Sequence, residues 1–394
     1  MDIFEKCHKF EDADKAKEQG FYPYFYPVGS AEDTEVIVDG KKKIMLGSNN
    51  YLGLTTHPKI KEAAKKAIDE YGTGSCGSRF LNGTLDIHIE LEKELAKFVK
   101  KEAALVFSTG YQTNLGIMSA LLGKNDMVVL DKWDHASIVD GTRLGFAQVM
   151  RFRHNDMDHL RKILDKIPKE KGILIVVDGV FSMEGDIAKL PELVEIKKEY
   201  GARLMIDDAH SIGILGPNGA GTADHFNMFD EVDLIMCTFS KSFASLGGFV
   251  AGDAKVIDYI KHFGRPMIFS ASLPPAMVAS ARAALEIIKT DKKRREHLWK
   301  VAKMWQDGLR NMGFDIGDTQ TPIVPIIIGD DQKTFYFWKA LMDAGVYTNP
   351  VITPAVPPGR QLLRTSIMAT HTEEQIQKAL HITGEIGRKM GIVK

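Results

Sequence analysis

The sequence predicts an α/β protein with a mostly parallel sheet between helices, and three observations carry that prediction. Short apolar runs alternate with amphipathic segments along most of the 394 residues. Most of the runs are continuous, as in strands that are covered on both faces. The loops between these segments contain Gly, Ser, Asp and His. The predicted strands span residues 104–107, 127–130, 173–177, 204–206, 234–236 and 249–251.

The segment 58–71 is predicted to be a helix. Ile60, Ala63, Ala67 and Ile68 recur at a spacing that places them on one helical face. Gly72 follows directly and is a residue that commonly ends helices.

The character of the chain changes after Pro275. A long helical pattern runs into the polar stretch KKRREHLWK, and the remainder is typical of a smaller α+β unit. In this unit we expect strands at 323–328 and 362–367 and helices at 332–345 and 372–390. The predicted parts are an N-terminal segment (1–55), a large domain (56–285) and a small C-terminal domain (286–394).

The composition excludes several classes of protein. Lys and Arg number 51 against 52 Asp and Glu, so the formal net charge is −1 and no basic surface for nucleic acid is expected. The longest apolar runs fall short of the ~20 residues that a membrane-spanning helix needs. The first twenty residues lack the apolar stretch of a secretion signal, so we expect a cytoplasmic protein. The three cysteines form no CxxC pair, which argues against a disulfide framework or a zinc ribbon.

One glycine-rich motif points to a different class of enzyme. Residues 72–77 read GTGSCG, which matches the dinucleotide fingerprint GxGxxG. That fingerprint requires a strand before it and a helix directly after it, whereas these glycines follow a predicted helix. An NAD-dependent oxidoreductase is therefore a distant alternative. The P-loop, HExxH and GxSxG motifs are absent from the sequence.

Residues in four loops have the side chains that pyridoxal phosphate requires. Lys241 lies in TFSKSFASLGGF, just beyond a predicted strand, and Asp207 ends another strand in MIDDAHS. The lysine can form a Schiff base, while the carboxylate can keep a pyridine nitrogen protonated, so that the ring acts as an electron sink. A surface lysine and a helix-capping aspartate are the ordinary alternatives for either residue alone.

Two histidines accompany them. His210 follows Asp207 in the same loop and could reach the phenolic oxygen of the cofactor. His135 in DKWDHASIVDG follows a predicted strand, and its flat imidazole could stack on the pyridine ring. A lone histidine is more often a satisfied polar group, but here two such loops converge on one cofactor.

A phosphate site is predicted at the start of a helix. Gly110 and Tyr111 open a helix after the strand ALVF, and a helix start presents free backbone N–H groups to an anion. Thr238 and Ser240 offer hydroxyls to the same phosphate. A turn or capping role is the alternative for these two hydroxyls.

A cation is needed to recognise a substrate carboxylate. Arg364 in LLRTS lies on a predicted strand of the small domain, and the planar guanidinium suits a carboxylate in two-point geometry. Asn50 in GSNNYLGL is a second candidate for the same anion.

The motifs NNYLGL, GSRFLNGT, DHASIVDG, DGVFSMEGD, DDAHSIG, TFSKS and LLRTS follow one another in this order along the chain. Together they resemble the α-oxoamine synthases, pyridoxal-phosphate enzymes of fold type I. The resemblance extends from about Tyr22 to the last helix. Members of this family condense an amino acid with an acyl-CoA thioester and release carbon dioxide.

The resemblance implies a role for each candidate residue. It makes Lys241 the Schiff-base lysine, Asp207 the partner of the pyridinium, His135 the ring-stacking residue and His210 the residue at the phenolic oxygen. The implied cofactor contacts also include Gly110, Tyr111, Thr238, Ser240, Ser182 in FSME and, from the second subunit of a homodimer, Ser270 in FSAS. Arg364 matches the arginine that receives the substrate carboxylate, and no metal is implied. The family often has a Thr in the segment 269–272, and this chain has none there.

Two loops, TFSKSFASLGGFVAG and GTGSCGSRFLNGTLDIH, most resemble those of bacterial members that begin sphingolipid synthesis. These soluble homodimers condense L-serine with palmitoyl-CoA to 3-oxosphinganine, CoA and CO2. Sister members that make 8-amino-7-oxononanoate, 2-amino-3-oxobutyrate or 5-aminolevulinate remain alternatives. A noncatalytic subunit is disfavoured because Lys241 is present. Peripheral contact with the inner membrane face is compatible with lipid substrates, although no basic amphipathic helix with an aromatic face is evident.

Overall fold

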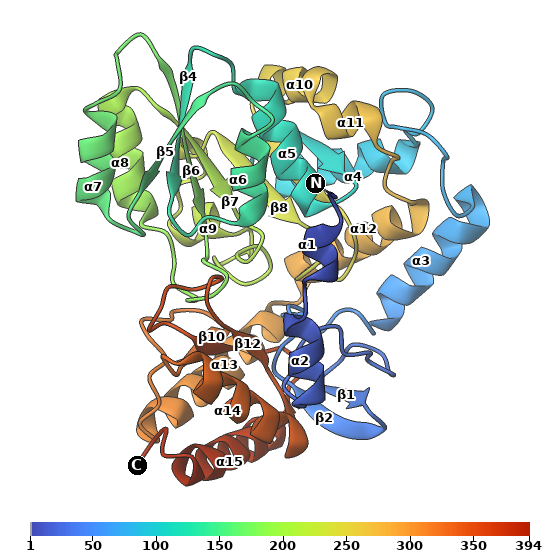
Figure 1. The fold of residues 1–394 in the computed structure, drawn as a ribbon. Helices are drawn as coiled ribbons and strands as arrows, with labels where there is room; N and C mark the ends of the chain where they lie inside the picture. Colours follow the sequence, from blue (N-terminus) through green and yellow to red (C-terminus); the bar gives the residue numbers. More distant parts are fainter. Residues whose placement is uncertain (1) are drawn as a thin grey trace.

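The computed structural model describes residues 2–394 and contains one large sheet and two small ones. Figure 1 shows the large sheet with its helices in the upper part and the C-terminal elements below, close to the N-terminal strands. The large sheet has the order β3 (Ala103–Phe107), β9 (Gly248–Gly252), β8 (Leu234–Thr238), β7 (Arg203–Asp207), β6 (Gly172–Asp178), β4 (Asp126–Asp131) and β5 (Gln148–Phe152). Only β9 runs antiparallel to its neighbours within this sheet. The predicted α/β class and mostly parallel sheet are confirmed.

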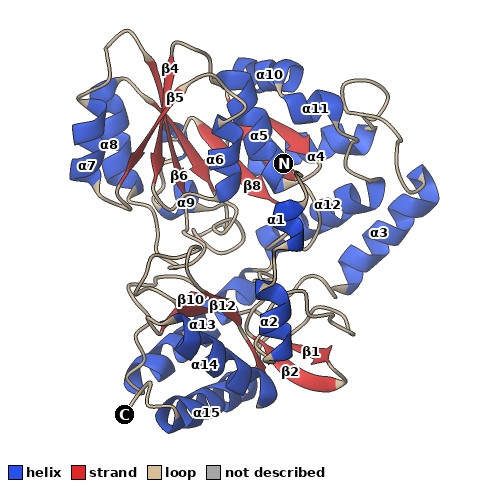
Figure 2. Ribbon diagram, viewed as in Figure 1, coloured by secondary structure: helices blue, strands red, loops and turns tan. Residues whose placement is uncertain are grey.

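The continuous apolar runs arise because the large sheet is buried on both faces. Along β6, Ile175 and Val177 belong to one hydrophobic cluster, while Leu174 and Val176 belong to another. Successive side chains of a strand point to opposite faces, so each face needs its own apolar set. Figure 2 shows helices flanking this sheet. The first cluster includes residues of α3 (Pro58–Tyr71), α4 (Asp86–Phe98), α7 (Met157–Leu164), α8 (Leu190–Tyr200) and α12 (Pro275–Thr290), and the second those of α5 (Gly110–Leu121), α6 (Ala136–Thr142), α10 (Ala254–Phe263) and α11 (Arg265–Phe269).

The C-terminal part is built on a small antiparallel sheet. Its order is β10 (Ile323–Ile327), β13 (Leu362–Ser366) and β12 (Asn349–Val351), with α13 (Lys292–Asn311), α14 (Asp331–Asp343) and α15 (Glu373–Lys389) as its helices. A third sheet joins β1 (Glu35–Val38) and β2 (Lys41–Met45) to β11 (Val346–Tyr347). The remaining elements are α1 (Glu5–His8), α2 (Asp12–Glu18), α9 (Thr222–His225) and the 3-10 helix η1 (Phe229–Glu231).

The helix predicted at 58–71 and the predicted large-sheet strands are present. The strand β5 was not predicted, because QVMRF is mostly polar or exposed at the edge of the sheet and lacks the apolar run of the inner strands. The predicted boundary at residue 285 falls within α12, and β2 pairs with β11 from the C-terminal part. The three-part division therefore stays a prediction.

The glycines of GTGSCG do not form a dinucleotide site. Gly72 ends α3 with φ of 77°, and the chain then loops to α4, so a helix precedes the motif where a strand is required. The residues that follow the motif have a structural role. Arg79 forms two hydrogen bonds with the carboxylate of Glu92 on α4, at 2.8 and 3.1 Å, and Glu92 also accepts from the Val106 N–H of β3. This buried pair fixes the loop against the sheet.

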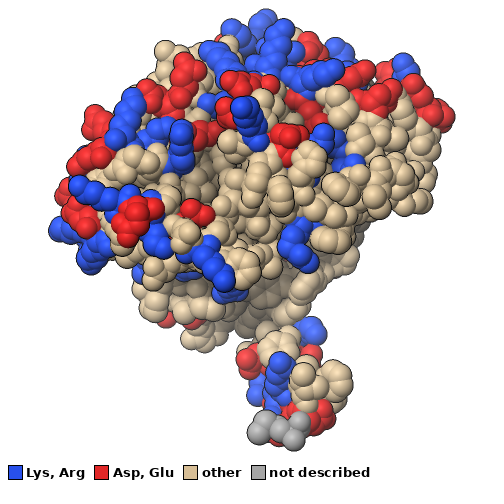
Figure 3. All heavy atoms as spheres, turned by 90° about the horizontal axis from the view of Figure 1, so that it is seen from above, with Lys and Arg blue, Asp and Glu red and all other residues tan. Residues whose placement is uncertain are grey.

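The surface has no concentrated charge on the face seen from above. In Figure 3, Lys and Arg are interspersed with Asp and Glu around a broad uncharged area. In that view the N-terminal segment projects away from the rest of the molecule. Within residues 2–394, no helix has both the length and the apolar character needed to cross a membrane.

Candidate active site

A cavity of about 260 Å³ lies at the carboxyl ends of β6, β7 and β8. Asp178, Asp207 and Thr238 end these three strands, so parallel neighbours bring their last side chains to one edge of the sheet. Open α/β sheets bind ligands at this edge. The predicted site residues that line the cavity are Gly110, Tyr111, His135, Asp207, His210, Thr238, Ser240 and Lys241.

Lys241 lies in the loop after β8 and contacts His210. Its Nζ is 2.7 Å from Nε2 of His210. Burial lowers the pKa of Lys241 to about 8, although the carboxylates of Asp207 and Asp178 act in the opposite direction. Burial and the charge of Lys241 also hold the pKa of His210 well below its ordinary range. The amine therefore loses its proton at a much lower pH than an ordinary lysine does, while the imidazole is uncharged.

Asp207 is buried and held as a hydrogen-bond acceptor. The Asn114 amide donates to its Oδ2 at 2.8 Å, and the Ala209 N–H donates to its Oδ1 at 3.1 Å. Asn114 lies one helical turn after Gly110 on α5 and was not predicted from the sequence. The spacing of four residues between Gly110 and Asn114 could have indicated Asn114, since it places both residues on the same helical face.

His135 caps the start of α6. Its Nδ1 accepts from the Ser137 N–H at 3.2 Å and lies 2.7 Å from the Ser137 hydroxyl. Burial lowers the pKa of His135, partly offset by the carboxylate of Asp207. Because the pKa is low and Nδ1 accepts, the ring is neutral with its proton on Nε2. A neutral, fixed imidazole can present its face to the cavity.

The start of α5 approaches the end of β8 very closely. A Cβ at Gly110 would lie 2.6 Å from the Thr238 side chain, so only glycine fits there. The hydroxyls of Thr238 and Ser240 are 2.9 Å apart, beside this helix start. The first N–H groups of a helix have no intrahelical acceptor and favour anions. The arrangement suits a phosphate group.

Four predicted residues do not line this cavity: Asn50, Ser182, Ser270 and Arg364. Arg364 on β13 donates from Nε to the Ser182 carbonyl at 2.6 Å. Asn50 uses its side chain within its own loop, donating to Thr55 at 2.8 Å and accepting from the Leu54 N–H. The Ser270 hydroxyl accepts from Gln112 at 3.0 Å, close to the start of α5. Of these, Arg364 reaches the cavity indirectly through Tyr51, which contacts both Arg364 and His210.

Buried carboxyl groups beneath the cavity were also missed by the sequence reasoning. Burial raises the pKa of Asp178 and of Asp134 well above the ordinary range, and the nearby charges of Asp207 and Asp178, respectively, add to the effect. Asp178 lines the cavity, and its Oδ1 accepts from the His135 N–H. Its place at the end of the run ILIVVD was the available sequence signal.

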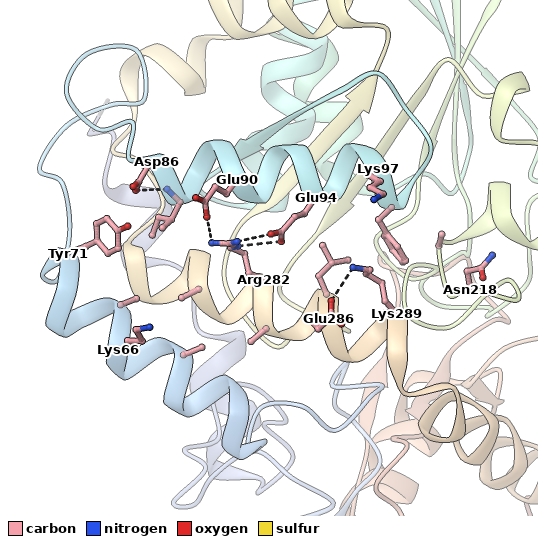
Figure 4. A pocket seen from close by; sticks show the side chains of 18 of the residues that line it. Lys66, Tyr71, Asp86, Glu90, Glu94, Lys97, Asn218, Arg282, Glu286 and Lys289 are labelled. Atoms are coloured by element: carbon pink, nitrogen blue, oxygen red, sulfur yellow. Dashed lines mark hydrogen bonds and ion pairs between the residues drawn. The ribbon is translucent and has the colours of Figure 1, made fainter.

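A larger groove of about 1160 Å³ lies elsewhere, between α3, α4 and α12. Figure 4 shows its charged side chains facing one another. Arg282 pairs with Glu90 and Glu94, and Lys289 pairs with Glu286. These side chains are engaged with one another, and the groove holds none of the predicted site residues. Across residues 2–394 no group of three His, Cys, Asp or Glu could hold a metal ion.

The residues at the smaller cavity fit pyridoxal phosphate. Together they provide an amine, a carboxylate, two neutral imidazoles and two hydroxyls. They also provide a helix start that comes close to Thr238 because Gly110 has no side chain. Each functional group of this cofactor thus has a partner of suitable chemistry: the aldehyde, the ring nitrogen, the ring face, the phenolic oxygen and the phosphate.

Comparisons with known proteins identify the family to which the chain belongs. The family model described as aminotransferase class I and II matches residues 41–382. A serine palmitoyltransferase of Sphingobacterium spiritivorum is 56% identical over 378 residues, which cover 96% of this chain and 95% of that protein. An 8-amino-7-oxononanoate synthase of Treponema denticola is 44% identical over 378 residues, which cover 96% of each.

The solved structures also match along the whole chain. A serine palmitoyltransferase with pyridoxal phosphate superposes with a TM-score of 0.96 at 40% identity, covering 100% of both chains. The resemblance to pyridoxal-phosphate enzymes of fold type I is therefore confirmed. The chain belongs to the aminotransferase class I and II family and is a pyridoxal-phosphate-dependent transferase of fold type I.

Proposed function

We propose that this protein catalyses the decarboxylative condensation of L-serine with palmitoyl-CoA to 3-oxosphinganine, CoA and CO2, the reaction of a serine palmitoyltransferase. The observation that carries the proposal is the position of Lys241. Its amine lies 2.7 Å from His210, has a pKa lowered to about 8, and faces the cavity that also contains Asp207. The relative from Sphingobacterium spiritivorum supports the choice of reaction.

Each group in the cavity has an assigned role in holding the cofactor. Lys241 would attach it covalently, and Asp207 would pair with its protonated ring nitrogen. His135 would lie against the ring, and His210 would face the phenolic oxygen. The start of α5 with Thr238 and Ser240 would hold the phosphate. Ser182 does not line the cavity, and its proposed place near the ring rests on the family resemblance.

Bound pyridoxal phosphate supplies an electron sink for the bonds at Cα of an amino acid. Asp207 sustains that sink, because its charge stabilises a proton on the ring nitrogen. Lys241 moves the Cα proton: because its pKa is lowered from 10.5 to about 8, the unprotonated Nζ that can accept this proton is far more abundant near neutral pH than in an ordinary lysine. The buried surroundings of Lys241 keep this amine from being fully charged.

Arg364 is the proposed partner of the substrate carboxylate. Its hydrogen bonds with described residues use Nε and Nη2, which leaves Nη1 for a bound anion. Asn50 is the second proposed contact, and it lines a neighbouring cavity of about 550 Å³. That cavity shares Ser240, Lys241 and Leu246 with the first, and we assign it as the approach for the thioester. An apolar channel can select chain length, since each buried CH2 contributes about 0.8 kcal/mol.

The decisive experiment is mass spectrometry of the product after cofactor-loaded protein is mixed with L-serine and palmitoyl-CoA. We expect 3-oxosphinganine, formed only when serine is present. The Lys241→Ala variant is the matched control and should bind the cofactor without covalent attachment and yield no product. Product formed only from glycine or L-alanine with a shorter thioester would replace this proposal with a sister synthase. The absence of product from every pair would overturn both.

We also propose a homodimer in which Ser270 of one subunit contacts the phosphate held by the other. Its support is the exposure of the neighbouring Phe269, a large apolar residue that is 73% exposed in the single chain. Burial of such a side chain between two copies would stabilise the dimer. We place the protein in the cytoplasm, with peripheral contact at the inner membrane face as its means of meeting lipid substrates. Sedimentation of the purified protein, with and without lipid vesicles, tests both statements.

A further inference from the structure

Tyr51 lies at the centre of a buried hydrogen-bond network beside the cavity. Its side chain is fully buried, and its Oη is 2.6 Å from Nδ1 of His210. The same oxygen lies 3.1 Å from Oδ1 of Asn49 and 3.2 Å from Nη2 of Arg364. Tyr51 therefore links the proposed carboxylate-binding arginine to the histidine that faces Lys241.

The chemistry of these groups determines where the tyrosine proton lies. A guanidinium only donates, so the Asn49 atom at 2.8 Å from Nη2 of Arg364 is the amide oxygen. That oxygen cannot donate to Tyr51. The Tyr51 hydroxyl therefore donates to Asn49, and its two lone pairs remain to accept from Arg364 and His210.

The protons of His210 follow from its two neighbours. Below pH 8 Lys241 is mainly an ammonium, which only donates, so Nε2 of His210 accepts from Nζ at 2.7 Å. Burial holds the pKa of His210 well below its ordinary range, so the ring carries a single N–H. That proton is on Nδ1 and is donated to Tyr51. Both ring nitrogens of His210 and the hydroxyl of Tyr51 then have partners of the right kind.

We propose that Tyr51 is a positioning residue that sets which ring nitrogen of His210 carries the proton, and thus whether Nε2 faces the cavity as acceptor or as donor. A hydroxyl suits this role because it can reverse its direction. When an oxygen that needs a donor replaces the lysine at Nε2, the hydroxyl can turn from Asn49 and donate to Nδ1. Without such a partner, the buried Nδ1 would lack a hydrogen bond both when it carries the proton and when it does not, and the missing bond is unfavourable in each case.

The proton position is measured directly by 15N NMR of the cofactor-free protein with labelled histidine. The His210 signals are assigned by their loss in His210→Gln. In the wild type we expect Nε2 to resonate as an unprotonated nitrogen and Nδ1 as a protonated one. In Tyr51→Phe the ratio of the two tautomers should change about tenfold toward protonated Nε2, the effect of one net hydrogen bond. A His210 spectrum unchanged by Tyr51→Phe overturns the proposal.

Asn49→Ala is the second variant, and it leaves the Tyr51 side chain in place. It removes the acceptor that holds the tyrosine proton, so the hydroxyl should turn to Nδ1 and shift His210 in the same direction. This variant decides the question if Tyr51→Phe fails to fold. Tyr200→Phe removes a hydroxyl that bonds to Asp165 at 2.6 Å outside this network, and it should leave His210 unchanged.

Cofactor affinity separates positioning from a general structural role. This step rests on the proposed function, whereas the NMR measurement does not. Equilibrium dialysis should show that Tyr51→Phe weakens pyridoxal phosphate binding about tenfold when His210 is present, and by less than about twofold in the His210→Gln background, since coupled residues are not additive. Equal losses in both backgrounds would overturn the role through His210. No binding by the wild type would overturn the proposed function instead.

Discussion

At the scale of single residues, burial and neighbouring charge determine what each group in the cavity can do. Lys241 and Asp207 lie in one cavity, yet their surroundings differ. Burial lowers the pKa of Lys241 to about 8, whereas Asn114 and the Ala209 N–H hold Asp207 as an acceptor. The pair therefore combines a basic nitrogen with a fixed negative charge, which suits proton transfer next to an electron sink.

Asp207→Asn tests the role of that fixed charge. The amide is nearly the same size, so the variant should fold and retain bound cofactor. Turnover should fall by at least about 100-fold, because a neutral amide does not stabilise a protonated ring nitrogen. Bound cofactor is measured by absorbance and turnover by CoA release. Asp307→Asn on the exposed face of α13 is the control, and wild-type turnover in Asp207→Asn would contradict the assignment.

The lowered pKa of Lys241 predicts how fast the free protein captures pyridoxal phosphate at different pH values. Only the unprotonated amine attacks the aldehyde, so the capture rate should rise with pH and level off above the pKa of Lys241. Its midpoint should lie near pH 8, rather than near the ordinary lysine value of 10.5. Borohydride trapping at timed intervals, followed by mass spectrometry of the peptide containing Lys241, measures the rate. A midpoint above pH 10 would show that burial does not lower this pKa.

At the scale of elements, the site depends on how closely helix α5 approaches the end of β8. Gly110 permits this approach and places the helix start beside two hydroxyls. The parallel arrangement of β6, β7 and β8 brings Asp178, Asp207 and Thr238 to the same edge. The anion site is therefore a property of the packing between elements.

Gly110→Ala should weaken cofactor binding about tenfold or more. The added Cβ would lie 2.6 Å from Thr238, so the start of α5 must move away from the hydroxyls. A shift of this kind removes hydrogen bonds to a charged group, each of which contributes about 1.5–3 kcal/mol. Equilibrium dialysis measures the affinity. Gly74→Ala is the matched control, because open space surrounds that glycine. Unchanged affinity in Gly110→Ala would exclude this helix start as the phosphate site.

At the scale of the whole molecule, buried histidines make the stability of the fold depend on pH. His88 on α4 donates from Nε2 to the Leu273 carbonyl, 2.8 Å away, and His371 lies in the loop before α15. Burial lowers the pKa of each to about 4. His154 differs: burial opposes its charge, but hydrogen bonds to Asp131 and Asp186 raise its pKa to about 9. These three residues link parts of the chain that are distant in sequence.

The free energy of unfolding should fall as the pH drops from about 6.5 to 4. In this range the unfolded chain binds protons at positions 88 and 371 that the folded chain excludes, so stability decreases with decreasing pH. A shift from 6.5 to about 4 corresponds to about 3 kcal/mol for each fully buried histidine at the acid limit. The contribution of His154 has the opposite sign: it is complete below about pH 6.5 and is lost as the pH rises through about 9.

Urea unfolding at a series of pH values measures this dependence. His88→Gln should reduce the slope between pH 6.5 and 4, whereas His381→Gln, at an exposed position on α15, should leave it unchanged. An identical slope in His88→Gln and the wild type would show that His88 does not carry the effect.

The sequence by itself determined the fold class and the core of the site. Continuous apolar runs predicted strands that are buried on both faces, and Lys241, Asp207, His135 and His210 each follow such a strand, so their convergence at one edge could be expected. The edge strand β5 was missed because its residues are largely exposed and lack an apolar run. Local patterns predict strands and helices because the spacing of apolar residues along an element shows which of its faces are buried.

The tertiary structure alone decided which distant groups complete the site. Arg364 contacts Ser182 across 182 positions, and Tyr51 contacts His210 across 159. Asn114 reaches Asp207 from another element, 93 positions away. Such hydrogen bonds leave no periodic signal in the sequence. They depend on how the helices and strands pack together, and on which buried polar atoms still need a partner after that packing.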